Sequence, residues 1–114
     1  MSFNHVNNAG AEARYIYVNY VDGGGDNHMG QADGVSSVSD HGTGDFTVTY
    51  TTAMGSADYA VGGSIVGSSS DNYYSFITAS GSAKATGNCR FQICHHGGTI
   101  NDQGAISIIV FGDS

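Results

Sequence analysis

Two adjacent histidines, His95 and His96, are the residues whose types most readily suggest a metal site. Imidazoles and thiolates are ligands that zinc prefers, and Cys94 lies two residues before His96. Adjacent residues on a strand point to opposite faces, so the two imidazoles of one chain cannot share an ion. Equivalent histidines around a three-fold axis could do so. We predict no metal and no cofactor, and keep an axial site at His95 or His96 as the alternative to an ordinary polar strand end.

Two polar loops combine carboxylates with amides, which are oxygen ligands for calcium. One loop spans residues 22–28 and the other residues 70–72. Neither has the EF-hand spacing, which needs alternating ligands and a closing bidentate glutamate. Aspartate and asparagine are also ordinary turn formers, so no calcium site is predicted.

The second loop runs into two tyrosines, which makes it a candidate sugar site. An exposed tyrosine ring covers the C–H face of a sugar, while neighbouring carboxylates and amides bind its hydroxyls. The alternative is a turn with tyrosines that pack in the usual way. The candidate ligand-binding residues are Asp71, Asn72, Tyr73 and Tyr74, followed by Asp22, Asp26, Asn27 and His28 of the first loop.

Motifs for catalysis are absent from the sequence. Glycoside hydrolysis usually needs two carboxyl groups that flank the bond, and the only glutamate is Glu12. No G-x-S-x-G nucleophile motif and no phosphate-binding glycine motif occurs. We therefore predict that the protein is not an enzyme. A polysaccharide-degrading enzyme that uses loop aspartates is the catalytic alternative.

The two cysteines, Cys89 and Cys94, lie within one expected strand. Their odd separation puts the sulfurs on opposite faces and too far apart for a disulfide. We interpret both as small, free, buried or half-buried residues. The sequence therefore gives no sign of an oxidising folding compartment.

The charge of the chain limits its partners. The formal net charge is −7, and the three fixed cations are Arg14, Lys84 and Arg90. Nucleic acids and anionic membranes require clusters of lysine and arginine, so we predict no nucleic-acid partner and no membrane insertion, and the charge disfavours anionic membrane surfaces. No apolar run is long enough to span a membrane, and residues 1–10 lack a signal-peptide core. These features fit synthesis in a cytoplasm and a neutral glycan or a cationic protein as partner.

The candidate residues lie on or between expected β-strands. Proline is absent, glycine contributes 18 residues, and apolar stretches of period two alternate with Gly, Asp, Asn and Ser turns. The clearest hairpin runs from Val35 to Met54, where Phe46, Val48, Tyr50 and Met54 share one face. An antiparallel β-sandwich of about seven strands is predicted. The expected strands are Tyr15–Val21, Val35–Ser39, Phe46–Thr52, Tyr59–Val66, Tyr73–Thr78, Cys89–His95 and Ile106–Phe111.

Two of these strands are apolar on both faces. Residues 15–20 read Tyr-Ile-Tyr-Val-Asn-Tyr, and residues 106–111 read Ile-Ser-Ile-Ile-Val-Phe. In a two-layer monomer the outer face of each sheet meets water. A second covered surface is therefore expected, and contact with other subunits is its simplest cover. The alternative is that the tyrosine hydroxyls reach the surface and a loop partly covers Ile109.

From about Ala13 to Gly112 the chain resembles the C-terminal domains of phage tail-fibre and tail-tip proteins. The likeness lies in the aromatic strand at residues 13–20, the hairpin at residues 35–48, the segment 46–61 and the closing Val110-Phe111-Gly112. The chain departs from that pattern because it has no tryptophan in the first strand and a polar stretch at residues 21–32. The resemblance therefore assigns no ligand-binding residue to this chain.

The resemblance implies a homotrimeric receptor-binding tip of a virion, synthesised in the host cytoplasm, that attaches to a host-surface glycan or protein. Residues 1–14 are expected to form an arm or junction, and residues 15–114 a single β-sandwich domain. A structural trimerisation or decoration domain of a virion is one alternative, and a cellular lectin or carbohydrate-binding module is another.

Overall fold

The structure is a computed structural model that describes residues 5–6, 12–22, 28–66, 74–78, 84–95 and 103–113. Within these ranges the protein consists of strands and turns and contains no helix, which confirms the all-β prediction. The described strands are β1 (His5–Val6), β2 (Glu12–Asp22), β3 (His28–Asp33), β4 (Val35–Gly42), β5 (Asp45–Tyr50), β6 (Ala60–Val66), β7 (Tyr74–Thr78), β8 (Asn88–His95) and β9 (Gln103–Asp113).

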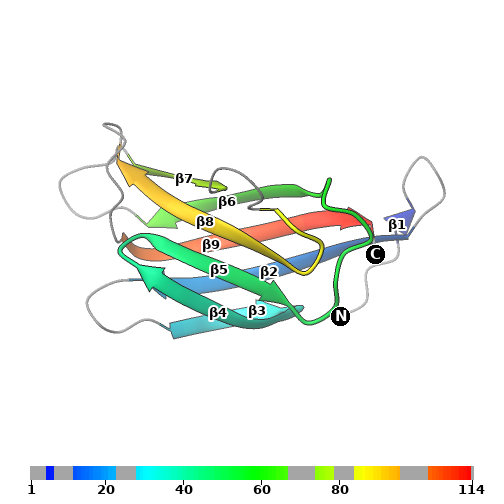
Figure 1. The fold of residues 1–114 in the computed structure, drawn as a ribbon, viewed down its shortest axis with the longest axis horizontal. Helices are drawn as coiled ribbons and strands as arrows, with labels where there is room; N and C mark the ends of the chain where they lie inside the picture. The colour runs from blue at the N-terminus through cyan, green and yellow to red at the C-terminus, as the bar shows by residue number, and fades with distance from the viewer. Residues whose placement is uncertain are drawn as a thin grey trace.

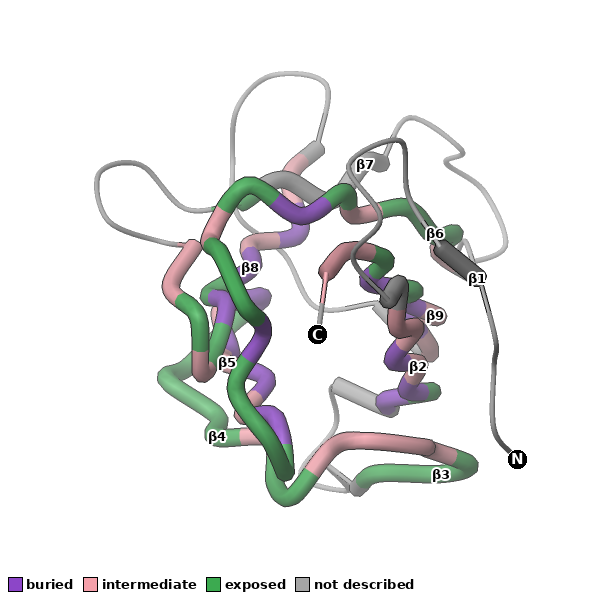
Figure 2. The backbone as a smooth tube through the Cα atoms, turned by 90° about the vertical axis from the view of Figure 1, so that its right-hand side faces the viewer, coloured by how far each residue is buried: buried purple, intermediate pink, exposed green. Residues whose placement is uncertain are grey.

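These strands form two antiparallel sheets that face each other (Figure 1). The first, sheet A, has the order β1-β2-β9-β6, and β3 also pairs with β2. The second, sheet B, has the order β4-β5-β8-β7. Viewed along the strands, the two sheets lie on opposite sides of the molecule, and buried residues recur along β5 and β8 on one side and β2 and β9 on the other (Figure 2). The architecture is therefore sandwich-like, as the sequence predicts.

The core consists of alternate residues from the central strands of both sheets. Sheet A contributes inward side chains from β2 and β9, and sheet B contributes them from β5 and β8. Phe46 lies between Tyr20 and Phe91, with ring centroids 4.9 Å and 5.8 Å away. The strand members of the core are Ile16, Val18, Tyr20, Phe46, Val48, Tyr50, Cys89, Phe91, Ile93, Ile106, Ile108 and Val110.

The hairpin expected from Val35 to Met54 is present as β4 and β5. Its turn passes through Gly44 at φ +60°, a left-handed conformation that glycine adopts without a Cβ penalty. The Asp40 carboxylate accepts a hydrogen bond from the Gly42 amide at 2.9 Å. Phe46, Val48, Tyr50 and Met54 are all buried, as their alternation predicts.

Gly34 lies at the corner where the chain leaves sheet A and enters sheet B. It joins β3 to β4 at φ +78°, and a Cβ there would come within 3.2 Å of Ile16. Glycine therefore satisfies both the backbone conformation and the close approach to the core.

The segment between β5 and β6 closes one end of the sandwich. Met54 and Tyr59 are buried there. The Met54 amide donates to the Thr86 carbonyl at 2.8 Å, and the Gly55 amide donates to the Asp113 carbonyl at 2.9 Å. These bonds connect sheet B to the end of β9, so the segment holds the two layers together.

The structure differs from the sequence prediction at several element boundaries. All seven expected strands are present, but β4 continues to Gly42, β5 ends at Tyr50 and β9 extends over eleven residues. The strand His28–Asp33 was not predicted because it lacks alternation and β-branched residues; it forms by pairing with β2. Strand β2 begins at Glu12, within the expected N-terminal arm, and β1 pairs with it.

Replacing Gly112 with alanine should destabilise the fold. A Cβ at Gly112 would lie 2.7 Å from the Tyr59 Cβ, so the β5–β6 segment must shift. We expect the free energy of unfolding to fall by about 1–3 kcal/mol, as for other overpacked sites. Chemical denaturation measures it. Gly87→Ala is the matched control, because its Cβ would meet nothing within 4 Å. Equal stability of the two variants would contradict this account of the closed end.

Candidate functional site

Most predicted ligand residues lie outside the part of the chain that the structure describes. This applies to Asp71, Asn72, Tyr73, Asp26 and Asn27, and to His96 of the alternative metal site. Asp22, His28, Tyr74 and His95 are placed by their backbones only. These residues therefore remain predictions as ligand contacts.

Backbone pairing relates two of these candidates to each other. Tyr74 of β7 is the cross-strand partner of His95 of β8, at one end of sheet B. Asp22 and His28 lie near the end of sheet A, at the β2–β3 connection, where Val21 pairs with His28 and Asp22 with Gln103. The candidates thus come from strand ends, which is where loop-borne recognition sites are usually built.

The outer side of sheet B is a polar face of hydroxyl, amide and charged side chains. It is the solvent side of β4, β5 and β8, opposite the core residues of the same strands. This polar face comprises Ser37, Ser39, Asp45, Thr47, Thr49, Asn88, Arg90 and Gln92.

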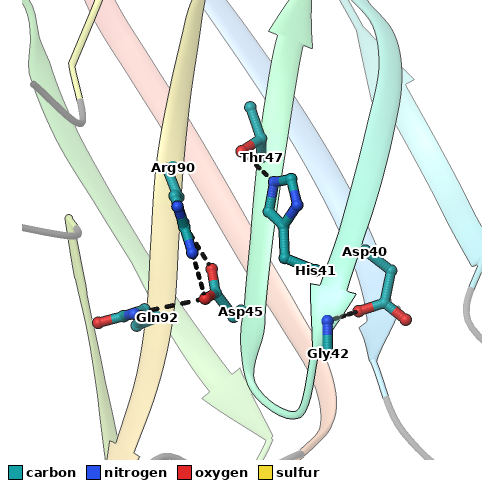
Figure 3. Close-up of polar contacts among 7 residues, drawn as sticks. All are labelled: Asp40, His41, Gly42, Asp45, Thr47, Arg90 and Gln92. Atoms are coloured by element: carbon teal, nitrogen blue, oxygen red, sulfur yellow. Dashed lines mark hydrogen bonds and ion pairs between the residues drawn. The ribbon is translucent and has the colours of Figure 1, made fainter.

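A bidentate ion pair between Arg90 and Asp45 is the strongest polar contact on this face (Figure 3). The Arg90 Nε donates to one carboxylate oxygen at 2.8 Å, and an Nη donates to the other at 2.6 Å. These hydrogen bonds hold the pKa of Asp45 below its ordinary value, against the opposing effect of burial. The contact joins β5 to β8 across 45 residues of sequence. No motif in the sequence predicted this ion pair.

His41 makes a second contact on this side of the hairpin. One of its ring nitrogens lies 2.7 Å from the Thr47 hydroxyl, across the β4–β5 turn (Figure 3). The sequence analysis did not single out His41 or Thr47. Their contact orders the end of the hairpin and gives the polar face an imidazole next to hydroxyls.

All three fixed cations of the chain are engaged in structural contacts. Arg14 donates to the Thr52 carbonyl at 2.6 Å. Lys84 donates to the Tyr59 carbonyl at 2.7 Å and lies 5.0 Å from the centre of the Tyr59 ring. Arg90 is paired with Asp45. The low number of cations and their internal contacts leave no basic patch for an anionic ligand.

The nucleophilic and phenolic groups near Tyr59 are buried. Burial raises the pKa of the Cys89 thiol to about 11 and that of Tyr59 to about 12. A thiol that is protonated and inaccessible at neutral pH is a poor nucleophile. Cys89 is buried, Cys94 is half-buried, and both are free thiols. This group therefore supports the core and does not form a reactive site.

The outer side of sheet A is uncharged along the middle of β2, β9 and β6, although Asp33 of β3, the cross-strand partner of Tyr17, lies beside it. This uncharged face consists of Tyr15, Tyr17 and Asn19 from β2, Ser107, Ile109 and Phe111 from β9, and Ala60, Gly62 and Ser64 from β6. Ile109 is 53% exposed and Phe111 is 38% exposed. The Tyr15 and Tyr17 rings are stacked, with centroids 6.3 Å apart. The two-sided apolar character expected of β2 and β9 is therefore present.

Neither a cluster of metal ligands nor a membrane-spanning helix is found among the described residues. Within them, no group of three His, Cys, Asp or Glu side chains is arranged to hold a metal ion. The same part of the chain has no helix of the length and hydrophobicity needed to cross a membrane.

Comparison with known proteins finds no matching protein-family model, no similar curated protein and no similar solved structure. The resemblance to phage tail-fibre domains is therefore untested by relatives.

Asp45→Asn should lower the melting temperature at neutral pH but not at acid pH. The pKa of Asp45 is lower in the folded chain than in the unfolded chain, where it is about 4. The ion pair therefore stabilises the fold above about pH 4, and this stabilisation is lost as the pH falls through the pKa of the folded chain. Because Arg90 is half exposed, we expect a melting temperature lower by at most about 5 °C at pH 7. Thermal melts between pH 2 and pH 7 measure the difference.

Asp58→Asn is the matched control, since it removes the same charge from an exposed position. It should show no comparable pH-dependent difference. Equal behaviour of the two variants across this range would contradict a stabilising role for the ion pair.

The hydroxyls of Tyr50 and Tyr59 should differ in their contributions to stability. The buried Tyr50 hydroxyl has no hydrogen-bond partner among the described residues, whereas the Tyr59 hydroxyl lies 2.7 Å from the Ala85 carbonyl and donates to it. Tyr50→Phe should leave the free energy of unfolding unchanged or raise it by about 1 kcal/mol. Tyr59→Phe should lower it by about 1–2 kcal/mol. Denaturant titration of both variants tests this, and a larger loss for Tyr50→Phe would refute it.

Proposed function

We propose that this chain is a non-enzymatic attachment module of the phage tail-fibre type, which assembles as a homotrimer and binds a neutral glycan on a host cell. The observation that carries the proposal is the uncharged face of sheet A. Ile109 is more than half exposed at its centre, on a chain whose net charge is −7. Exposed apolar residues grouped on one face are typical of interaction surfaces.

The charges support a neutral ligand. Arg14, Lys84 and Arg90 all make internal contacts, so the long-range field of the protein is negative. That field repels nucleic acids, phosphorylated polysaccharides and acidic sugars. Neutral sugars are recognised through hydroxyls, amides and aromatic rings, which this chain has in abundance.

Attachment would depend on multivalency. Three weak sites on one rigid trimer give a high effective concentration for the second and third contacts. In the sequence, Asp71, Asn72 and Tyr73 directly precede Tyr74, the first residue of β7, so each copy would carry one such candidate site. Strong binding by a single deep site is not required.

A purely structural trimerisation or decoration domain is the second candidate. The uncharged face alone is sufficient for that function, since closure of the trimer needs only the apolar contact. A polysaccharide-degrading enzyme and a cellular lectin are also distinguishable by experiment. An enzyme would release new reducing ends from host glycan, and a lectin would bind glycan as a monomer.

The mass in solution tests the assembly. We expect sedimentation to give three times the chain mass of 11.7 kDa and Ile109→Lys to shift the protein to monomer. Ile109 is exposed, so the fold should persist in this variant. Asn88→Lys places the same charge on an exposed strand position of sheet B and should leave the trimer intact. A monomeric wild-type protein would refute the assembly.

Recognition is tested in the intact trimer. The double variant Asp71→Ala/Tyr73→Ala should lose binding to an array of neutral glycans at unchanged sedimentation. Asn88→Lys again serves as the control. Full binding by the double variant would contradict recognition by this loop, and an absence of glycan binding by the wild type would favour the structural candidate.

A further inference from the structure

Beside the uncharged face, β3 brings a carboxylate next to an aromatic ring. Tyr17 of β2 and Asp33 of β3 are cross-strand partners, so their side chains leave the same side of sheet A. Directly opposite Cβ atoms on paired strands lie about 5 Å apart. Both residues are half-buried. One small molecule can therefore touch the ring and the carboxylate together.

The backbone of Asp33 is fixed by the fold. Asp33 directly precedes Gly34, the corner at φ +78° where the chain passes from sheet A to sheet B. Gly34 packs so closely on the core that a Cβ there would lie 3.2 Å from Ile16. Within the described part of the chain, no hydrogen bond or ion pair to the Asp33 carboxylate occurs. The carboxylate is thus held beside Tyr17 and retains its capacity to accept hydrogen bonds.

Asn19 adds a hydrogen-bond donor further along β2. It lies two residues from Tyr17 on the same outer side, about 6.6 Å away along the strand. The Ser107 hydroxyl donates to the Asn19 side-chain oxygen at 2.5 Å. Because that oxygen is bonded and the residue is exposed, the NH2 group of Asn19 is available as a donor. The Tyr17 ring therefore has an acceptor on one side and a donor further along its strand.

The surface around Tyr17 is otherwise apolar. The rings of Tyr15 and Tyr17 are parallel to within 7°, with centroids 6.3 Å apart. Ile109, the partner of Tyr17 on β9, is more than half exposed. These side chains offer the C–H face of a ligand an apolar surface and an aromatic ring. An aromatic ring flanked by a carboxylate and an amide is the combination that suits a sugar.

We propose that Tyr17, Asn19 and Asp33 form a site for one or two rings of a neutral sugar, which we call the sheet A sugar site. The inference rests on the proposed glycan attachment and adds a second site to the candidate loop at residues 71–74. The Tyr17 ring covers the C–H face of the sugar, Asp33 accepts from its hydroxyls and Asn19 donates to one of its oxygens. The site uses β2 and β3, so it leaves β6 free for contact between copies.

Size and charge favour a small neutral ligand. Outward residues lie about 6.7 Å apart along a strand and strands about 4.8 Å apart, so each covers about 32 Å². The six outward residues of β2 and β9 together with Asp33 cover about 220 Å². Stable protein interfaces bury about 800 Å² per partner. Asp33 and the net charge of −7 repel anionic sugars, and a cation would meet a donor at Asn19 where it needs an acceptor.

Saturation-transfer NMR tests the site in the Asp71→Ala/Tyr73→Ala chain, which lacks the candidate loop side chains. The probes are neutral hexoses, N-acetylhexosamines, deoxyhexoses and their disaccharides. We expect transfer to at least one of them, strongest at its ring C–H protons. Asp33→Ala and Tyr17→Ala should each weaken this binding at least about tenfold. Tyr17→Phe keeps the ring and should bind as before. Asp58→Ala, which removes an exposed carboxylate elsewhere, is the matched control.

The outcomes separate this inference from the proposed function. Transfer that Asp33→Ala and Tyr17→Ala abolish, at unchanged melting temperature and sedimentation, supports the sheet A sugar site. Asp33→Asn keeps the shape of the side chain and provides the same test should Asp33→Ala melt earlier. Transfer that these variants retain, or no transfer to any probe, overturns the site, and the proposed function still stands if the wild type binds neutral glycans on the array. An absence of binding by the wild type overturns both.

Discussion

Side chains alternate between the two faces of the central strands, and this alternation determines both the core and the outer surface of sheet A. Once Ile16 and Val18 enter the core, Tyr15 and Tyr17 must point outward, because successive side chains on a strand leave opposite faces. The same rule puts Ile109 outside when Ile108 is inside. The core and the exposed apolar face are therefore two consequences of one sequence pattern, and the fold cannot bury both.

Hydrophobicity alone does not fix the register of sheet A, since β2 and β9 are apolar on both sides. A slip of one residue would exchange their faces at little hydrophobic cost. Polar and glycine contacts at the strand ends specify the register instead. Arg14 points inward and binds the Thr52 carbonyl, Gly112 leaves room for Tyr59, and Ser107 donates to the Asn19 side chain on the outer face. These contacts lie on different strands and reinforce one alignment.

The sequence predicted the features that depend on local pattern. The strands with clear alternation and the Val35–Met54 hairpin are present. The strand His28–Asp33 could not be predicted, because its residues have no strand preference and the pairing partner β2 supplies its order. The sequence could not predict the Asp45–Arg90 ion pair either, since this pair depends on the register of two strands far apart in the sequence. Contacts set by tertiary register have no local signature.

The distribution of charge limits how the proposed trimer could form. Such a trimer would bring three acidic chains together, and their repulsion falls off over about 8–10 Å at physiological ionic strength. A contact centred on Ile109 would meet little repulsion from the uncharged residues around it, and Asp33 beside Tyr17 would be its nearest described carboxylate on β3. Arg14 and Lys84 bind backbone carbonyls of their own chain, so ion pairs between copies would have few cations to draw on. Specificity of that assembly would then depend on the shape of one face more than on ion pairs.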